Sequence, residues 1–130
     1  MKNENEGKKF DLEERLIEFA ASIIEIAESL NNTRAGNHIS GQIVRSGTSP
    51  ALHYGEAQSA ESRNDFIHKL KILLKELRET LVALKIIRRV SLTKKIDLVE
   101  KGIIECNELI SIFVKSIDTA KKNIDKKQWL

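Results

Sequence analysis

Apolar residues recur along the chain at intervals of three and four, and the clearest series lies in the last third. Steps that alternate between three and four residues keep side chains on one face of a helix. A seam sustained over this length is expected where a helix packs nearly parallel to its neighbours. The pattern therefore predicts a helix over about 94–125. Its apolar positions are Ile96, Val99, Ile103, Cys106, Ile110, Phe113, Ile117, Ala120 and Ile124.

Two other segments carry the same helical spacing and a recognisable start. Asp11 with Glu14 three residues later resembles a capping box, and the pattern predicts a helix over about 11–30. Its apolar stripe is Leu12, Leu16, Phe19, Ile23, Ile26 and Leu30. We expect four further residues to widen this stripe: Ile17, Ala20, Ile24 and Ala27. Ser62 is a suitable N-cap for a second helix over about 62–90. The core face of that helix comprises Phe66, Leu70, Leu73, Leu74, Leu77, Leu81 and Leu84.

The segment 37–60 is harder to interpret because Ser-Gly-Thr-Ser-Pro-Ala interrupts it at 46–51. A proline inside a helix removes one backbone hydrogen bond and costs roughly 3 kcal/mol. Periodicity alone leaves two alternatives open. One is a loop at 46–51, and the other is a continuous helix that is kinked at Pro50, with small residues that allow close packing.

Short connections near 31–36, 60 and 91–94 join the four predicted helices. Short connections force neighbouring helices to run antiparallel. We therefore predict an all-α, antiparallel up-down-up-down four-helix bundle over 11–125, with mobile tails at 1–10 and 126–130.

Composition narrows the class of protein. The chain has 130 residues, of which 41% are hydrophobic and 32% charged, which suits one folded domain. Its single cysteine excludes an internal disulfide framework. No apolar run approaches the roughly 20 residues of a membrane span, and the start of the chain is polar. We expect no signal peptide, no contact with a membrane and a cytoplasmic location.

Patterns for catalysis or metal binding are missing from the sequence. Di-metal helical bundles use Glu-x-x-His, but no Glu here is followed three positions later by His. His38, His53 and His68 lie 15 residues apart, so no two share a helical turn. Phosphate-binding glycine loops and nucleophile elbows are also missing. We expect no enzyme activity, no metal, no cofactor and no small-molecule substrate.

One cysteine and one group of polar residues are nevertheless candidates for reactive sites. Cys106 lies on the apolar seam, where a buried thiol is inert. A polar group in 37–60 consists of Arg45, His53, Tyr54 and Glu56. An enzyme could use such a set, but groups of this kind more often form hydrogen bonds between helices, which is our prediction.

Charge is distributed unevenly between the helices. Residues 63–95 contain ten basic and three acidic residues, whereas residues 1–30 contain four basic and eight acidic residues. Five cations of the predicted helix 62–90 fall within about ±40° of one line that is about 27 Å long. We refer to them as the basic stripe: Lys71, Lys75, Arg78, Lys85 and Arg89.

Three interpretations of the basic stripe remain open from the sequence. It has the form of a footprint for a phosphate backbone. It could equally pair with a protein partner, such as the acidic first helix of another copy, or it could simply face solvent. No aromatic residues interleave with it, so stacking on single-stranded bases is poorly supported.

Apolar residues outside the core stripes predict a second buried surface. A monomeric bundle needs only one apolar stripe per helix, so the surplus favours self-association. The predicted interface positions are Ile72, Ile86, Val90, Leu109 and Ile112.

The middle of the chain resembles a known family. The run TRAGNHISGQIVRSGTSP at 33–50 is followed by Tyr54, by DFIHKL at 65–70 and by LKE at 74–76. This is similar to bacterial four-helix-bundle proteins encoded in intervening sequences of 23S rRNA genes, and the resemblance covers about 11–120. Gly55 and Ala83 depart from the family pattern, which has Ala and Trp there.

The resemblance implies more than the residues alone do. It implies that the segment 37–60 is one helix that continues through Pro50. It also implies that the protein forms ring-like homo-oligomers, commonly pentamers. The family has no assigned enzyme chemistry. A related accessory protein of diversity-generating retroelements forms such a ring and binds a reverse transcriptase and nucleic acid. By analogy, we expect a scaffold or adaptor associated with RNA or with a nucleic-acid-processing protein. The alternative is a protein-interaction module with no nucleic-acid role.

Overall fold

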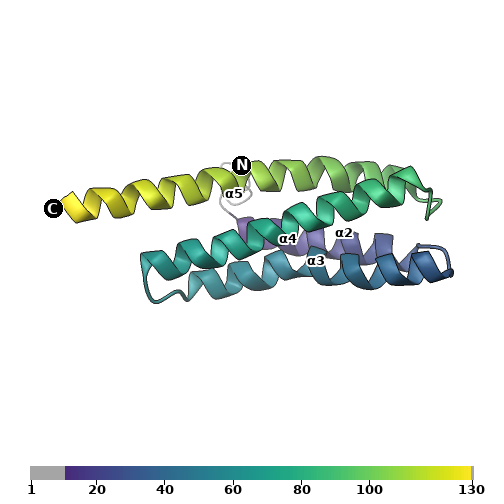
Figure 1. Cartoon of the computed structure of the whole chain (residues 1–130), viewed down its shortest axis with the longest axis horizontal. Helices are drawn as coiled ribbons and strands as arrows, with labels where there is room; N and C mark the ends of the chain where they lie inside the picture. Colours follow the sequence, from purple (N-terminus) through teal and green to yellow (C-terminus); the bar gives the residue numbers. More distant parts are fainter. Residues whose placement is uncertain (1–10, 130) are drawn as a thin grey trace, which may run out of the picture.

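Four helices connected by short turns make up the computed structural model, which describes residues 11–129 and the side chains of residues 11–123. Successive helices run antiparallel (Figure 1), which confirms the predicted all-α four-helix bundle. The tail predicted at 1–10 lies outside the described residues. The helices are α2 (Leu12–Glu28), α3 (Arg34–Gln58), α4 (Arg63–Arg89) and α5 (Ile96–Trp129).

Side-chain caps set the starts of three helices. Asp11 and Ser62 cap α2 and α4 as predicted, by accepting hydrogen bonds from the backbone N–H groups of Glu14 and Asp65 at 3.0 Å. Thr33 does the same for α3 through the N–H of Gly36 at 3.0 Å. For this reason α3 begins three residues earlier than the sequence pattern predicted.

The end of α5 corrects one prediction. The helix continues to Trp129, so residues 126–129 are helical and do not form the predicted tail. The stretch after Ala120 contains neither Gly nor Pro to stop a helix, and its lysines suit the negative end of the helix dipole.

The turn between α4 and α5 uses a left-handed residue. Ser91 has a φ of 52°, and the N–H of Leu92 donates to the carbonyl of Ile87 at 3.2 Å. Together these features form a Schellman-type end to α4. The buried Thr93 hydroxyl then lies 2.7 Å from that of Ser29, which ties the turn to the end of α2.

Helix α3 is continuous through Pro50, so the loop alternative is excluded. Proline has no N–H, so the carbonyl of Ser46, four residues before Pro50, loses its helical donor. The Thr48 hydroxyl donates to the carbonyl of Val44 at 2.7 Å, and the Ser49 hydroxyl donates to that of Arg45 at 2.6 Å. Both hydroxyls bond back to carbonyls four residues earlier in the helix, and neither replaces the donor that Pro50 lacks.

The small residues of α3 allow close contact with both neighbouring helices. Gly47 is buried, and a Cβ atom there would lie 2.5 Å from Cγ2 of Ile23 in α2. On the α4 side, the hydroxyls of Ser46 and Thr80 form a hydrogen bond at 2.9 Å, and both residues are fully buried. The Ser-Gly pair therefore supplies one close approach and one polar link.

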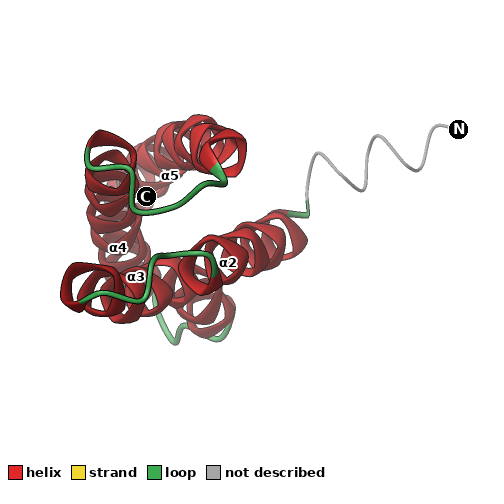
Figure 2. Ribbon diagram, turned by 90° about the vertical axis from the view of Figure 1, so that its right-hand side faces the viewer, coloured by secondary structure: helices red, strands yellow, loops and turns green. Residues whose placement is uncertain are grey.

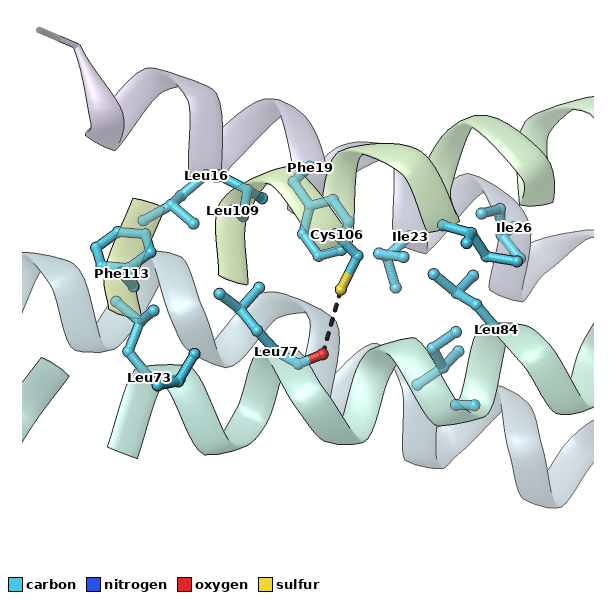
Figure 3. Packing of buried hydrophobic residues seen from close by; sticks show 14 of the residues in the cluster. Leu16, Phe19, Ile23, Ile26, Leu73, Leu77, Leu84, Cys106, Leu109 and Phe113 are labelled. Atoms are coloured by element: carbon cyan, nitrogen blue, oxygen red, sulfur yellow. Dashed lines mark hydrogen bonds between the residues drawn. The ribbon is translucent and has the colours of Figure 1, made fainter. Parts of the chain in front are cut away.

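The core extends along the bundle axis and draws on every helix. Figure 3 shows α2, α4 and α5 side chains such as Phe19, Leu77 and Leu109 meeting around Cys106. An end-on view shows α2 beside α3 and α4 beside α5 (Figure 2). The core seam predicted for the last helix is confirmed at Val99, Ile103, Cys106, Phe113, Ile117 and Ala120.

Helices α2 and α5 contact each other less extensively than neighbours in the chain do. One bidentate ion pair links them, in which Nε and Nη2 of Arg15 donate to the two carboxylate oxygens of Glu105 at 2.7 and 2.8 Å. Within residues 11–129, no helix is long and apolar enough to cross a bilayer.

Candidate functional site

All five cations of the basic stripe lie on the surface of α4, and every one is exposed. None forms an ion pair with a carboxylate among the described residues. The nearby acids Glu76 and Glu79 bind Arg45 of α3 instead, with Glu76 at 2.9 Å. The interhelical pairing thus draws these carboxylates towards α3, and the positive charge of the stripe is not neutralised by them.

A groove lies beside the first half of the stripe, between α4 and α5. Its volume is about 330 Å³. Lys71, Arg78 and Lys121 are among its lining residues, and Asp118 is the one acid among them. Asp118 pairs with Lys122 at 3.2 Å. The lining of the groove therefore combines three cations with the apolar residues Leu74, Val114 and Ile117.

The predicted polar group in α3 does not form a single cluster. Arg45 forms ion pairs with Glu76 and Glu79 of α4. Glu56 instead forms an ion pair with Lys69 of α4, with a distance of 3.4 Å between Nζ and Oε2. Both contacts join α3 to α4, which agrees with the predicted interhelical role for these two residues. Because they engage different partners, Arg45 and Glu56 do not assemble into the set that a catalytic site would require.

His53 and Tyr54 have different surroundings from each other. Nδ1 of His53 is buried and lies 3.6 Å from Oε2 of Glu56, which is too long for a hydrogen bond. Tyr54 packs edge-on against Phe113 of α5, with ring centroids 5.9 Å apart. Burial raises the pKa of the Tyr54 phenol above its usual range. Tyr54 is therefore a packing residue at the edge of the core.

The predicted interface positions divide into three groups. Ile86 and Val90 are exposed, and Ile72 and Ile112 are half-buried within the chain. Leu109 is fully buried, so its assignment to a subunit interface is wrong. It lies one turn from both Cys106 and Phe113, because the buried face of α5 is wider than a single heptad seam.

Two apolar residues of α2 lie outside the core against the prediction, and one exposed apolar residue of α4 was not predicted. Ile17 and Ile24 were expected to widen the core stripe, but each is 44% exposed. Val82 is 57% exposed and lies among the cations of the stripe. One signal for the α2 residues was available: five glutamates share their face, which is unusual for the edge of a core.

The chemistry of the remaining reactive groups is restricted. Among the described residues, no three His, Cys, Asp or Glu side chains lie close enough together to hold a metal ion. Burial raises the pKa of the Cys106 thiol to about 12, and its Sγ lies 3.2 Å from the carbonyl oxygen of Leu77 (Figure 3). A thiol in this state is a poor nucleophile.

Fold and surface together define a charge-polarised antiparallel four-helix bundle protein. The family model described as "23S rRNA-intervening sequence protein" matches residues 8–115. The chain belongs to this family. No curated protein matches it.

A solved structure of similar fold is a Bacteroides thetaiotaomicron protein of unknown function from the S23 ribosomal protein family. The two chains are 34% identical with a TM-score of 0.73, and the match covers 81% of this chain and 96% of that one.

Proposed function

We propose that this protein is a non-enzymatic, homo-oligomeric scaffold or adaptor that associates with RNA through the first half of the basic stripe. The observation that carries the proposal is the exposed, uncompensated charge of Lys71, Lys75 and Arg78 beside a groove that adds Lys121. Cations in such a row bind a polyphosphate backbone and release its counterions.

The geometry favours duplex RNA over single strands. The stripe is straight because it follows one helix, and its described surroundings include no aromatic ring on which a base could stack. Contacts of lysine and arginine with phosphates position a protein without reading base sequence. Binding should therefore depend weakly on RNA sequence.

Assembly would strengthen such binding. A few cations per chain give modest affinity, but several copies held together convert later contacts into intramolecular ones. The resemblance that implies a ring, commonly a pentamer, supports this part of the proposal. A partner that processes nucleic acid could use the same assembled surface.

The test is the salt dependence of affinity for a fluorescent RNA duplex. Each neutralised phosphate contributes a slope of about −0.9 in log affinity against log salt on a DNA duplex and about −0.7 on a single strand. The variant Lys71→Gln/Lys75→Gln/Arg78→Gln should flatten the slope by roughly two units. A matched control, Lys94→Gln/Lys101→Gln/Lys115→Gln, removes the same charge from exposed positions on the α4–α5 turn and α5. An equal change in both variants would contradict a site on α4.

The alternative function is a protein-interaction module with no nucleic-acid role. It is favoured by the exposed apolar side chains on α3 and α5, of which Leu52 is 68% and Ile104 is 61% exposed. This alternative gains if the wild-type protein has no salt-dependent affinity for RNA but assembles normally.

A further inference from the structure

The exposed face of α2 combines an apolar row with a border of acids. Ile17, Ala21 and Ile24 recur at helical spacing, and all three are exposed. The border consists of five exposed glutamates, Glu13, Glu14, Glu18, Glu25 and Glu28. The one basic residue of the helix, Arg15, is turned away and pairs with Glu105 of α5. Glu25 forms an ion pair with Lys95 of the α4–α5 turn at 3.7 Å. The other four glutamates pair with no cation among the described residues, so the face keeps an acidic character.

The second half of α4 carries the opposite combination. Val82, Ile86 and Val90 recur every four residues and are 57%, 43% and 57% exposed. Lys85 and Arg89 lie beside them, and both are exposed. The apolar row spans about 12 Å at 1.5 Å per residue, and the α2 row spans about 10 Å on the same basis.

We infer that these two faces bind each other between copies: the α2 face of one chain packs on the second half of α4 of the next. Apolar rows of matching length would be buried together, and the glutamates of α2 would lie against Lys85 and Arg89. Complementary charge selects this pairing over α2 with α2 or α4 with α4, where like charges would oppose each other. The inference rests on the oligomeric part of the proposed function and names the surfaces that form the oligomer.

An interface between two different faces has a geometric consequence. Such a head-to-tail contact leaves one free face at each end of a dimer, so further copies add, and they form a closed ring where the rotation between successive copies closes. The first half of the basic stripe takes no part in the contact. Lys71, Lys75 and Arg78 would remain available on every copy, and the basic stripe would divide into an RNA half and an assembly half.

The pairing is tested with two neutral variants that each disable one face. Ile17→Gln/Ile24→Gln alters the α2 face, and Val82→Gln/Ile86→Gln alters the α4 face. Glutamine suits exposed helix positions and leaves the charge unchanged. Each variant alone should lose the wild-type mass in light scattering and approach the monomer mass of 14.8 kDa. Circular dichroism should show unchanged helix content.

Mixing the two variants provides the decisive result. One retains a working α4 face and the other a working α2 face, so an equimolar mixture should form a dimer of twice 14.8 kDa and go no further. A mixture that stays monomeric, or a single variant that retains the wild-type mass, would overturn the inference. A wild-type protein that is itself monomeric would contradict oligomeric assembly altogether, whereas loss of RNA binding in the Lys71, Lys75 and Arg78 variant with unchanged mass would leave the pairing intact.

Discussion

Replacing Gly47 with alanine tests the close approach of α2 and α3. The added Cβ atom would lie 2.5, 2.9 and 3.0 Å from Cγ2, Cγ1 and Cβ of Ile23. Ile23 is fully buried, so it has no free space into which to move. The two helices must separate or the isoleucine must adopt a strained rotamer.

The expected magnitude follows from two opposing effects. Overpacking a core costs about 1–3 kcal/mol. Alanine is better than glycine in a helix interior by about 1 kcal/mol. Gly47→Ala should therefore reduce the free energy of unfolding by about 0–2 kcal/mol.

Gly41→Ala is the matched control, because Gly41 is an exposed residue of the same helix and a Cβ atom there would meet nothing within 4 Å. It carries the same helix-propensity gain without the clash, so it should stabilise the protein by about 1 kcal/mol. The difference between the variants isolates the contact with Ile23. It should be measured by urea unfolding followed by circular dichroism at one protein concentration, since assembly makes stability concentration-dependent.

A double-mutant cycle with Ile23→Ala completes this test. The alanine at position 23 removes the two γ-carbons that obstruct the new methyl group, which would then partly fill the cavity. The double variant should be more stable than the sum of the single effects predicts. Equal stability of Gly47→Ala and Gly41→Ala would refute a close contact between α2 and α3 at Gly47.

Four further substitutions test the α4–α5 turn, the hydrogen bond between Ser46 and Thr80, and the Cys106 thiol. Ser91→Gly should stabilise the protein by about 1 kcal/mol in thermal unfolding, because glycine adopts the left-handed conformation of residue 91 without strain; unchanged stability would contradict the strained turn. Thr80→Val should lower the free energy of unfolding by about 1–3 kcal/mol, because it leaves the buried Ser46 hydroxyl without its interhelical partner. Adding Ser46→Ala should recover much of that loss of stability. A folded-state pKa of about 12 for Cys106, against an ordinary value near 9, means that stability falls as pH rises above about 9, by up to about 1.4 kcal/mol per pH unit. Cys106→Ala should remove that component of the pH dependence, and a slope identical to that of the wild type would contradict it.

Helices α2, α4 and α5 could be predicted from the sequence because each carries a clear periodic apolar stripe, and α2 and α4 also carry a recognisable cap. Asp11 and Ser62 are examples of local sequence signals that are sufficient, since both cap the helices that they were predicted to cap. At Pro50, by contrast, local sequence signals are not sufficient to predict the structure. Local sequence alone does not decide whether a helix continues through a proline. The residues just before Pro50 pack closely on both neighbouring helices, through Gly47 on Ile23 and Ser46 on Thr80, and such tertiary contacts cannot be read from local sequence.

The candidate surfaces were only partly predictable, for a physical reason. Charge at helical spacing identifies an exposed face reliably, because unpaired lysine and arginine are rarely buried. The basic stripe on α4 was therefore placed correctly on the surface. Apolar side chains tolerate either environment, so Ile17 and Leu109 were assigned to the wrong sides of their helices. Which isoleucines and leucines meet the core depends on how all the helices pack together in three dimensions.

Sedimentation velocity of the wild-type protein with a fluorescent RNA duplex at low salt tests the proposed RNA-binding assembly in a single experiment. We predict that the protein alone sediments as a multiple of the 14.8 kDa chain, and that the RNA moves with this assembly and separates from it as salt is raised. A 14.8 kDa species that leaves the sedimentation of the RNA unchanged would contradict both the assembly and the RNA binding.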